Sequence, residues 1–132
     1  MEEKPVLVVD DENQILTMCR KALSRNGYLP FVARSPDAAM KILQERNIPV
    51  AFIDLHLHSR TDGVQLGRQI RKHDPSIQLY AMSGYASQGM RVECEQVGFI
   101  RFLEKPVSIH QLLSILEEEF KRTTSKKVNR PE

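Results

Sequence analysis

Short runs of apolar residues alternate along this chain with segments in which apolar residues recur every three or four positions. The runs at 6–9 and 50–53 are continuous, which is typical of strands buried on both faces of a sheet. Three further strands are predicted at 28–33, 77–82 and 99–104. Each is followed by helical spacing, so the chain consists of alternating strands and helices.

Helix start signals support this interpretation. Ser35 followed by Pro36 is a favourable N-cap and first helical residue, and the four residues that begin at Ser108 match a capping box. The predicted helices cover the apolar positions 15–23, 36–43, 64–70, 87–97 and 109–120. The fourth of these has only a thin apolar stripe.

Alternating strands and helices predict an α/β fold with a parallel sheet, because parallel strands need crossover connections. Pro30 lacks a backbone donor, which places the second strand at a sheet edge. We therefore predict a flavodoxin-like, doubly wound, five-stranded sheet in the order 2-1-3-4-5, with helices on both faces.

Length and charge divide the chain in two. The 132 residues carry a net charge of +2, but the segment 121–132 holds five basic residues and one acidic residue, which leaves residues 1–120 at −2. We expect one domain over 1–121 and a basic polar tail or linker start over 122–132. We do not expect the acidic domain to bind nucleic acid; a nucleic-acid-binding arm is the alternative for the tail.

Several classes of protein are disfavoured. No apolar run approaches the roughly 18–20 residues of a spanning helix, and the polar start does not resemble a signal peptide, so we expect a cytoplasmic protein without membrane contact. Cys19 and Cys94 are far apart and lack metal-ligand spacing, which argues against a disulfide framework or a structural zinc site.

Acidic residues follow the first and third predicted strands, between which the strand order reverses. Asp10, Asp11 and Asp54 are therefore expected at the position where open α/β sheets bind ligands. Neighbouring carboxylates repel one another unless a cation lies among them or a proton stays bound. An all-oxygen ligand set favours Mg²⁺.

The fourth and fifth strands add Ser83 and Lys105 to the same rim. A hydroxyl and an ammonium group beside a metal ion suit a bound phosphoryl group, whose transfer depends mainly on positioning and on neutralising oxygen charge. An aspartate can be the nucleophile in such chemistry.

These residues resemble the receiver domain of two-component response regulators, over about residues 4–121. Each motif is weak alone, but four in order, each at the end of a predicted strand, form a specific pattern. They are Asp10-Asp11, Asp54-Leu55, Ser83-Gly84 and Lys105-Pro106.

The resemblance implies a phosphorylation-controlled switch that needs Mg²⁺. Asp54 would accept a phosphoryl group from a phosphohistidine of a sensor histidine kinase, or from a phosphotransfer protein or small phosphodonor. Asp11 would bind the metal directly, Asp10 mainly through water, and Asp54 with the main-chain carbonyl of His56 would complete the protein ligands. The domain would gain and lose its own phosphoryl group but would not turn over a free substrate as an enzyme.

The resemblance also implies how the signal leaves the site. Lys105 would pair with Asp54 and then with the phosphoryl oxygens, and Ser83 would hydrogen-bond the phosphoryl group. Movement of Ser83 would let Phe102 turn inward, and the face formed by the fourth helix, fifth strand and fifth helix would change its preference for an output domain, a target protein or a second copy of the chain. Family members commonly hold the Lys-Pro peptide in cis.

Two further residues match positions that tune hydrolysis in this family. His56 follows the acceptor by two residues and Tyr85 follows Ser83 by two; we expect the bulky Tyr85 to hinder the attacking water. The loop departs from the family pattern, with Leu57-His58 where Met-Pro is common and a late Asp62-Gly63 turn.

Two alternative functions remain at this point. One is a receiver-like docking module that works without phosphorylation. The other is a dehalogenase-type phosphatase, although that family has Asp-x-Asp where this chain has Asp10-Asp11. His56 and His58 suggest a zinc or copper site, but without a third ligand they fit solvated loop residues better. A flavin or dinucleotide role lacks the glycine-rich motif.

Overall fold

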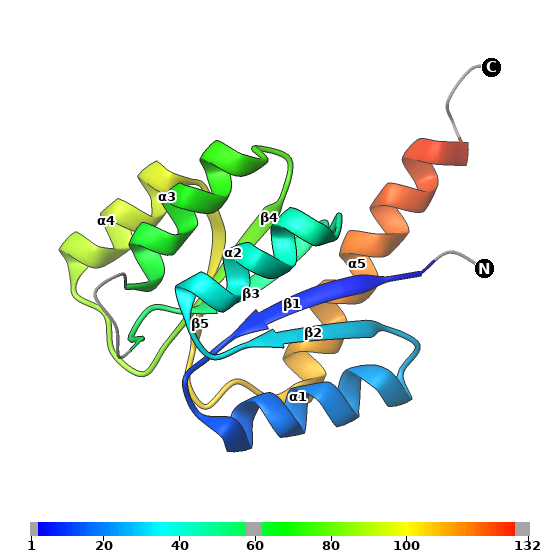
Figure 1. The fold of residues 1–132 in the computed structure, drawn as a ribbon, viewed down its shortest axis with the longest axis horizontal. Coiled ribbons are helices and arrows are strands. Elements are labelled where there is room, and N and C mark those ends of the chain that lie inside the picture. Colours follow the sequence, from blue (N-terminus) through cyan, green and yellow to red (C-terminus); the bar gives the residue numbers. More distant parts are fainter. Residues whose placement is uncertain (1–2, 58–61, 129–132) are drawn as a thin grey trace.

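The computed structural model describes residues 3–57 and 62–128, and its description of residues 122–128 is confined to the backbone. Five parallel strands form one sheet in the order β2-β1-β3-β4-β5 (Figure 1), which confirms the predicted topology and fold class. The strands are β1 (Pro5–Val9), β2 (Leu29–Ala33), β3 (Val50–Asp54), β4 (Gln78–Ser83) and β5 (Phe99–Glu104). The strand that contains Pro30 lies at the edge, where its missing donor costs no interior ladder bond.

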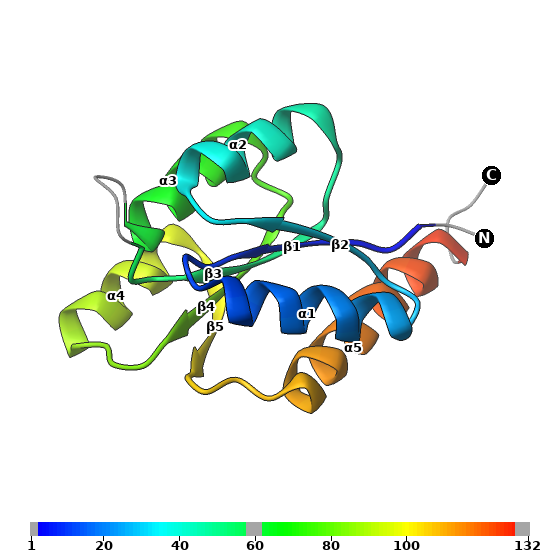
Figure 2. The ribbon, with the colours of Figure 1, turned by 60° about the horizontal axis from the view of Figure 1, so that its bottom comes forward.

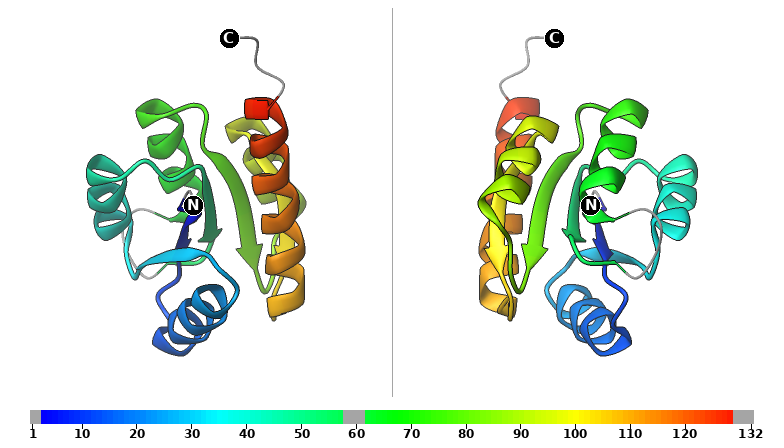
Figure 3. Two further views of the ribbon diagram at one scale, coloured as in Figure 1. Left: turned by 90° about the vertical axis from the view of Figure 1, so that its right-hand side faces the viewer. Right: turned by 90° about the vertical axis from the view of Figure 1, so that its left-hand side faces the viewer.

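Helices cover both faces of the sheet. They are α1 (Asn13–Arg25), α2 (Pro36–Glu45), α3 (Gly63–His73), α4 (Gln88–Val97) and α5 (Ile109–Val128). Figure 2 shows α2 and α3 on one side of the sheet and α1 and α5 on the other. The end-on views of Figure 3 likewise place α2 and α5 at opposite sides, with strands between them.

Two apolar layers hold the sandwich together, one on each face. Side chains that alternate along each central strand point to opposite layers, as the two-residue repeat of a strand requires. The first layer includes Leu7, Val9, Ile53, Leu79, Leu43, Leu66, Ile70 and Cys94, and the second includes Val6, Val8, Phe52, Leu16, Cys19, Leu23, Leu112 and Leu116. Both cysteines are buried and free.

Side-chain caps begin the helices where the sequence predicts. Ser35 Oγ accepts a hydrogen bond from Ala38 N at 3.2 Å, and Ser108 Oγ accepts one from Gln111 N at 3.1 Å. Ser87 caps α4 in the same way, at 3.1 Å from Met90 N. These caps define where the loops before α2, α4 and α5 end, whereas α1 begins at Glu12 without a side-chain cap.

The last helix runs beyond the predicted positions 109–120, since the backbone of α5 stays helical to Val128. The domain boundary at residue 121 and the basic polar tail or linker start over 122–132 stay predictions. Neither glycine nor proline occurs between residues 109 and 130, and Pro131 is the first helix breaker. Among the residues described, none of the helices combines the length and the apolar character needed to cross a bilayer.

Candidate functional site

The carboxyl ends of the central strands bring the predicted residues to one edge of the sheet. β1 and β3 pair through Val9 and Ile53, so the residues that come next in each strand, Asp10 and Asp54, lie side by side. On the other side of β3, the register opposes Asp54 to Met82, so Ser83 comes next at the same edge. Ser83 in turn opposes Glu104, the residue before Lys105.

Lys105 bridges the two buried carboxylates. Its Nζ lies 2.8 Å from Asp10 Oδ2 and 3.2 Å from Asp54 Oδ2. Asp10 is 0% exposed and Asp54 is 3% exposed. One ammonium group thus faces two carboxylates, and the trio carries an excess negative charge.

The other oxygen of each carboxylate accepts from the backbone. Glu12 N donates to Asp10 Oδ1 at 2.9 Å, and His56 N donates to Asp54 Oδ1 at 3.0 Å. Each bond closes a turn two residues long and holds the carboxylate against the strand end. The orientation of both carboxylates is therefore built into the backbone.

Burial raises the pKa of Asp54, and the negative charge of Asp10 adds to this effect. The bond from His56 N and the charge and hydrogen bond of Lys105 lower the pKa of Asp54, without cancelling the rise. Burial alone would lower the pKa of Lys105, but its bond to Asp10 and the charge of Asp54 raise it. Lys105 therefore stays protonated, and its single positive charge does not balance the two carboxylates.

Three consecutive acidic residues form a group able to hold a cation. Carboxylate oxygens of Asp10, Asp11 and Glu12 all lie within 4.8 Å of one another, and they form a group that Asp54 does not join. Oxygen ligands of this kind fit Mg²⁺. Sequence reasoning named Asp10 and Asp11 but missed Glu12, although the acidic run continues to it.

Close packing supports the third strand end. A side chain at Gly63, the first residue of α3, would collide with the main-chain oxygen of Asp54. A glycine there lets the helix start directly against the acceptor strand. Of the loop residues that depart from the family pattern, Leu57 is buried, and Asp62 caps α3 by accepting from Gln65 N at 2.8 Å. His58 lies outside the described residues.

Ser83, His56 and Tyr85 form a second cluster. His56 Nε2 lies 2.9 Å from Ser83 Oγ and 2.7 Å from the main-chain oxygen of Tyr85. Ser83 Oγ donates to that same oxygen and accepts from Tyr85 N at 3.1 Å. Tyr85 joins through its backbone, since its residue surface is 78% exposed.

Phe102 lies away from these clusters, half-buried against α4. The guanidinium carbon of Arg91 is 4.3 Å from the centre of its ring, a cation–π contact. Sequence reasoning singled out Phe102 but missed Arg91, because no motif marks a helix arginine that happens to cover a strand residue. Phe102 thus lies on β5 beside α4, and its role as the switch aromatic stays a prediction.

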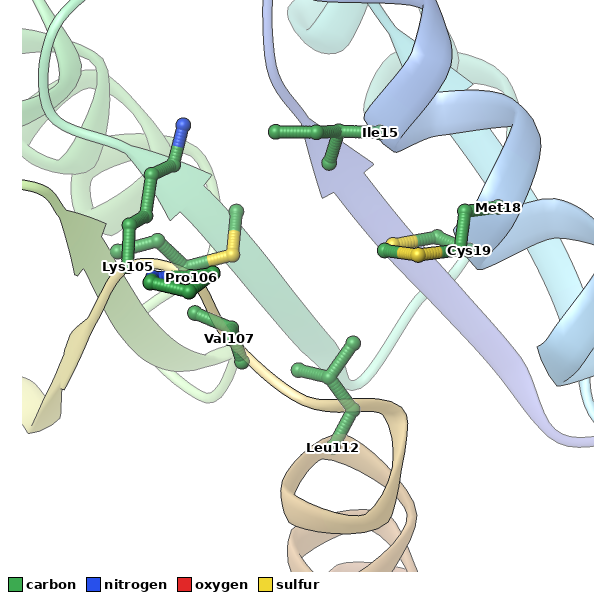
Figure 4. A pocket seen from close by; sticks show the side chains of 8 residues that line it. Ile15, Met18, Cys19, Lys105, Pro106, Val107 and Leu112 are labelled. Carbon is green, nitrogen blue, oxygen red and sulfur yellow. The ribbon is translucent and has the colours of Figure 1, made fainter.

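An apolar pocket of about 290 Å³ lies between α1 and the segment that joins β5 to α5 (Figure 4). The alkyl chain of Lys105 forms part of its wall, and the Lys105-Pro106 peptide is cis, as expected. The remaining lining is Ile15, Met18, Cys19, Met82, Pro106, Val107 and Leu112. The site thus combines a charged cluster with an apolar flank.

The family model for the response regulator receiver domain matches residues 6–117. An NtrX-like response regulator of Rickettsia felis is 29% identical over 130 residues, which are 98% of this chain but 27% of that protein. A CheY-like receiver domain protein from Methanospirillum hungatei has a TM-score of 0.88 at 24% identity, covering 95% of this chain and 99% of that one. A response regulator from Burkholderia pseudomallei, solved with a phosphorylated aspartic acid, a calcium ion and citrate, has a TM-score of 0.79 at 25% identity, covering 98% and 76%.

The chain spans about a quarter of the length of the first curated relatives that it matches. The family match covers most of the sheet and its helices, and it includes every strand end described above. The chain belongs to the receiver-domain family of response regulators.

Proposed function

We propose that this domain is a cytoplasmic switch that accepts a phosphoryl group on Asp54 from the phosphohistidine of a sensor histidine kinase, with Mg²⁺ bound beside it. The observation that supports this most is the sharing of Lys105 Nζ by two buried carboxylates, Asp10 and Asp54. Such a cluster holds more negative charge than its one lysine neutralises. A divalent cation relieves that excess.

Asp54 is the proposed acceptor because of its position. It ends the central strand β3, between Asp10 on one side and Ser83 on the other. The group of Asp10, Asp11 and Glu12, which is suited to hold the metal, begins at the neighbouring strand end. The predicted ligand set of Asp10, Asp11, Asp54 and the His56 carbonyl remains our proposal, with Glu12 as an added carboxylate near it.

The transfer step needs few groups. An oxygen of Asp54 attacks the phosphorus of the phosphohistidine, an O–P bond forms while the P–N bond breaks, and the leaving imidazole takes up a proton. When bound, Mg²⁺ neutralises charge on the phosphoryl oxygens. Lys105, already 3.2 Å from Asp54 Oδ2, pairs with a phosphoryl oxygen afterwards.

The readout would pass from Ser83 to Phe102 and to the face of α4, β5 and α5. That face would bind an output domain, a target protein or a second copy of the chain. The Burkholderia relative was solved with a phosphorylated aspartic acid and a calcium ion, which supports both aspartyl phosphorylation and divalent-cation binding in this family. Later attack by water would release inorganic phosphate and restore the carboxylate, with His56 and Tyr85 setting the rate.

Incubation with Mg²⁺ and a small acyl phosphate tests the proposal. Intact mass should rise by one phosphoryl group in the wild type and in Asp37→Asn, a matched control for an exposed aspartate on α2. Asp54→Asn should show no increase. An unmodified wild type, with partner binding unaffected by Asp54→Asn, would instead favour a docking module, and multiple turnover of a phosphate ester would favour a phosphatase.

A further inference from the structure

The hydroxyl group of Ser83 has used all its hydrogen-bonding capacity. A hydroxyl offers one hydrogen and two lone pairs. Its hydrogen goes to the main-chain oxygen of Tyr85, and its lone pairs receive Tyr85 N–H at 3.1 Å and His56 Nε2 at 2.9 Å. Ser83 itself is 1% exposed, whereas His56 is an exposed residue that reaches it from the loop after β3.

The contacts decide which ring nitrogen of His56 carries hydrogen. A main-chain oxygen only accepts hydrogen bonds, so Nε2, 2.7 Å from the oxygen of Tyr85, must be the donor. The same N–H is shared with Ser83 Oγ. The imidazole therefore connects the loop after β3 to Ser83, at the end of β4, and to Tyr85, two residues later.

We propose that the His56 imidazole is a latch that holds the Ser83 hydroxyl, and the segment between β4 and α4, in the resting arrangement. This inference rests on the proposed function, in which Ser83 turns to the phosphoryl group. To donate its hydrogen to a phosphoryl oxygen, Ser83 must release the oxygen of Tyr85. His56 favours the arrangement that phosphorylation has to replace, so it is a positioning residue.

The latch also lies on a direct path to the readout face. Tyr85 is two residues from Ser87, whose Oγ caps α4 through Met90 N at 3.1 Å. The first turns of α4 carry Arg91, which covers the ring of Phe102 at 4.3 Å. Release of the latch would thus free the segment that sets the start of α4. Removing the latch shifts the balance of the two arrangements toward the active one.

Two substitutions of His56 distinguish the loss of its hydrogen bonds from the loss of its side-chain volume. His56→Leu removes the donor and keeps an apolar side chain of similar reach, whereas His56→Gln offers a donor nitrogen at a similar distance. His73→Leu is the control. His73 lies on α3, and its Nε2 is 3.0 Å from the main-chain oxygen of Leu43 on α2. This substitution breaks the same kind of contact outside the site.

Amide hydrogen exchange of the unphosphorylated protein measures the latch without any phosphoryl chemistry. His56→Leu should speed exchange at the amide of Tyr85 by about threefold to tenfold, the effect of losing one hydrogen bond of ordinary strength. His56→Gln should return exchange to near the wild-type rate, and His73→Leu should leave it unchanged. Equal exchange at Tyr85 in His56→Leu and the wild type would overturn the proposal.

Titration with beryllofluoride and Mg²⁺, a mimic of the phosphoryl group, measures the consequence. His56→Leu should reach half-saturation at about threefold to tenfold less beryllofluoride than the wild type, and His56→Gln should stay close to it. An equal or higher half-saturation in His56→Leu would refute the latch. A wild type that binds no beryllofluoride would refute the proposed function instead, and the exchange measurement would still judge the latch.

Discussion

The two edges of the sheet place charged side chains in opposite ways. At the amino edge, near the start of β4 and β5, Arg71 donates to four main-chain oxygens. Its Nε is 3.2 Å from the oxygen of Val97, and its terminal nitrogens bind those of Pro75 at 2.9 Å, Gly98 at 2.8 Å and Ile77. The guanidinium group thereby ties the ends of α3 and α4 to the strands that follow them.

The carboxyl edge is less balanced. Lys105 serves two buried carboxylates, those of Asp10 and Asp54, so negative charge is left over. The four bonds of Arg71 all go to neutral main-chain oxygens, whereas the carboxyl edge keeps like charges together. We infer that the amino edge stabilises the fold, while the carboxyl edge gives up stability for the proposed binding of a cation and a phosphoryl group.

The largest expected effect is on phosphorylation when Lys105 is removed. Lys105→Met should lower the rate of phosphorylation by an acyl phosphate by about 10²–10³-fold, because a positioned charge no longer meets the developing phosphoryl charge. Intact-mass time courses give the rate. Lys41→Met, exposed on α2, is the control and should keep it. A Lys105→Met rate within twofold of the wild type would contradict the view that the carboxyl edge serves phosphorylation.

The amino edge should respond in the opposite way. Arg71→Leu should lower the free energy of unfolding by about 2–4 kcal/mol, since several bonds to a charged donor are lost together. Urea titration measures this, and the phosphorylation rate below the unfolding transition should not change. Arg68, like Arg71, lies on α3, and Arg68→Leu removes an exposed ion pair of 3.5 Å with Glu93 on α4, so it should cost less than about 1 kcal/mol. Equal losses for the two variants would show that the four bonds of Arg71 do not stabilise the fold.

Binding of Mg²⁺ should stabilise the folded protein by neutralising the excess negative charge at the carboxyl edge. Addition of Mg²⁺ in excess over its dissociation constant should raise the free energy of unfolding by about 1–3 kcal/mol, because the ion binds the folded cluster and not the unfolded chain. Arg71→Leu should keep this gain, and Asp11→Asn should lose most of it. Urea titrations with Mg²⁺ and with a chelator make the comparison. The same gain in Asp11→Asn would place the metal elsewhere.

The smallest effect concerns pH in the absence of metal. The folded-state pKa of Asp54 lies above its unfolded value, so the folded state binds the proton more tightly and the contribution of Asp54 to stability falls as pH rises through that window. Asp54→Asn removes this dependence, so its stability relative to the wild type should increase as pH rises from the ordinary aspartate range toward neutrality. Urea titrations in chelator at several pH values test the direction. A relative stability that decreases over this range would mean that Lys105 neutralises Asp54 fully.

Much of this arrangement could be predicted from the sequence. Continuous apolar runs located the strands, and β5 covers the predicted residues 99–104. Because parallel strands end at one edge, the placement of Asp10, Asp54, Ser83 and Lys105 followed from the strand order alone.

The contacts between side chains could not be predicted in the same way. Lys105 contacts two carboxylates, and the Ser83 hydroxyl binds His56 and the backbone of Tyr85. These contacts depend on rotamers and loop paths that hydrophobic periodicity does not specify. The four bonds of Arg71 join segments far apart in sequence, and no motif marks them.

Reductive trapping tests the central claim most directly. After incubation with Mg²⁺ and an acyl phosphate, borohydride converts an aspartyl phosphate to homoserine, and peptide sequencing by mass spectrometry locates that residue. The account predicts homoserine at position 54, with Asp10 and Asp11 unchanged. Homoserine at position 10 or 11, or at no aspartate of a protein that has gained a phosphoryl group, would contradict it.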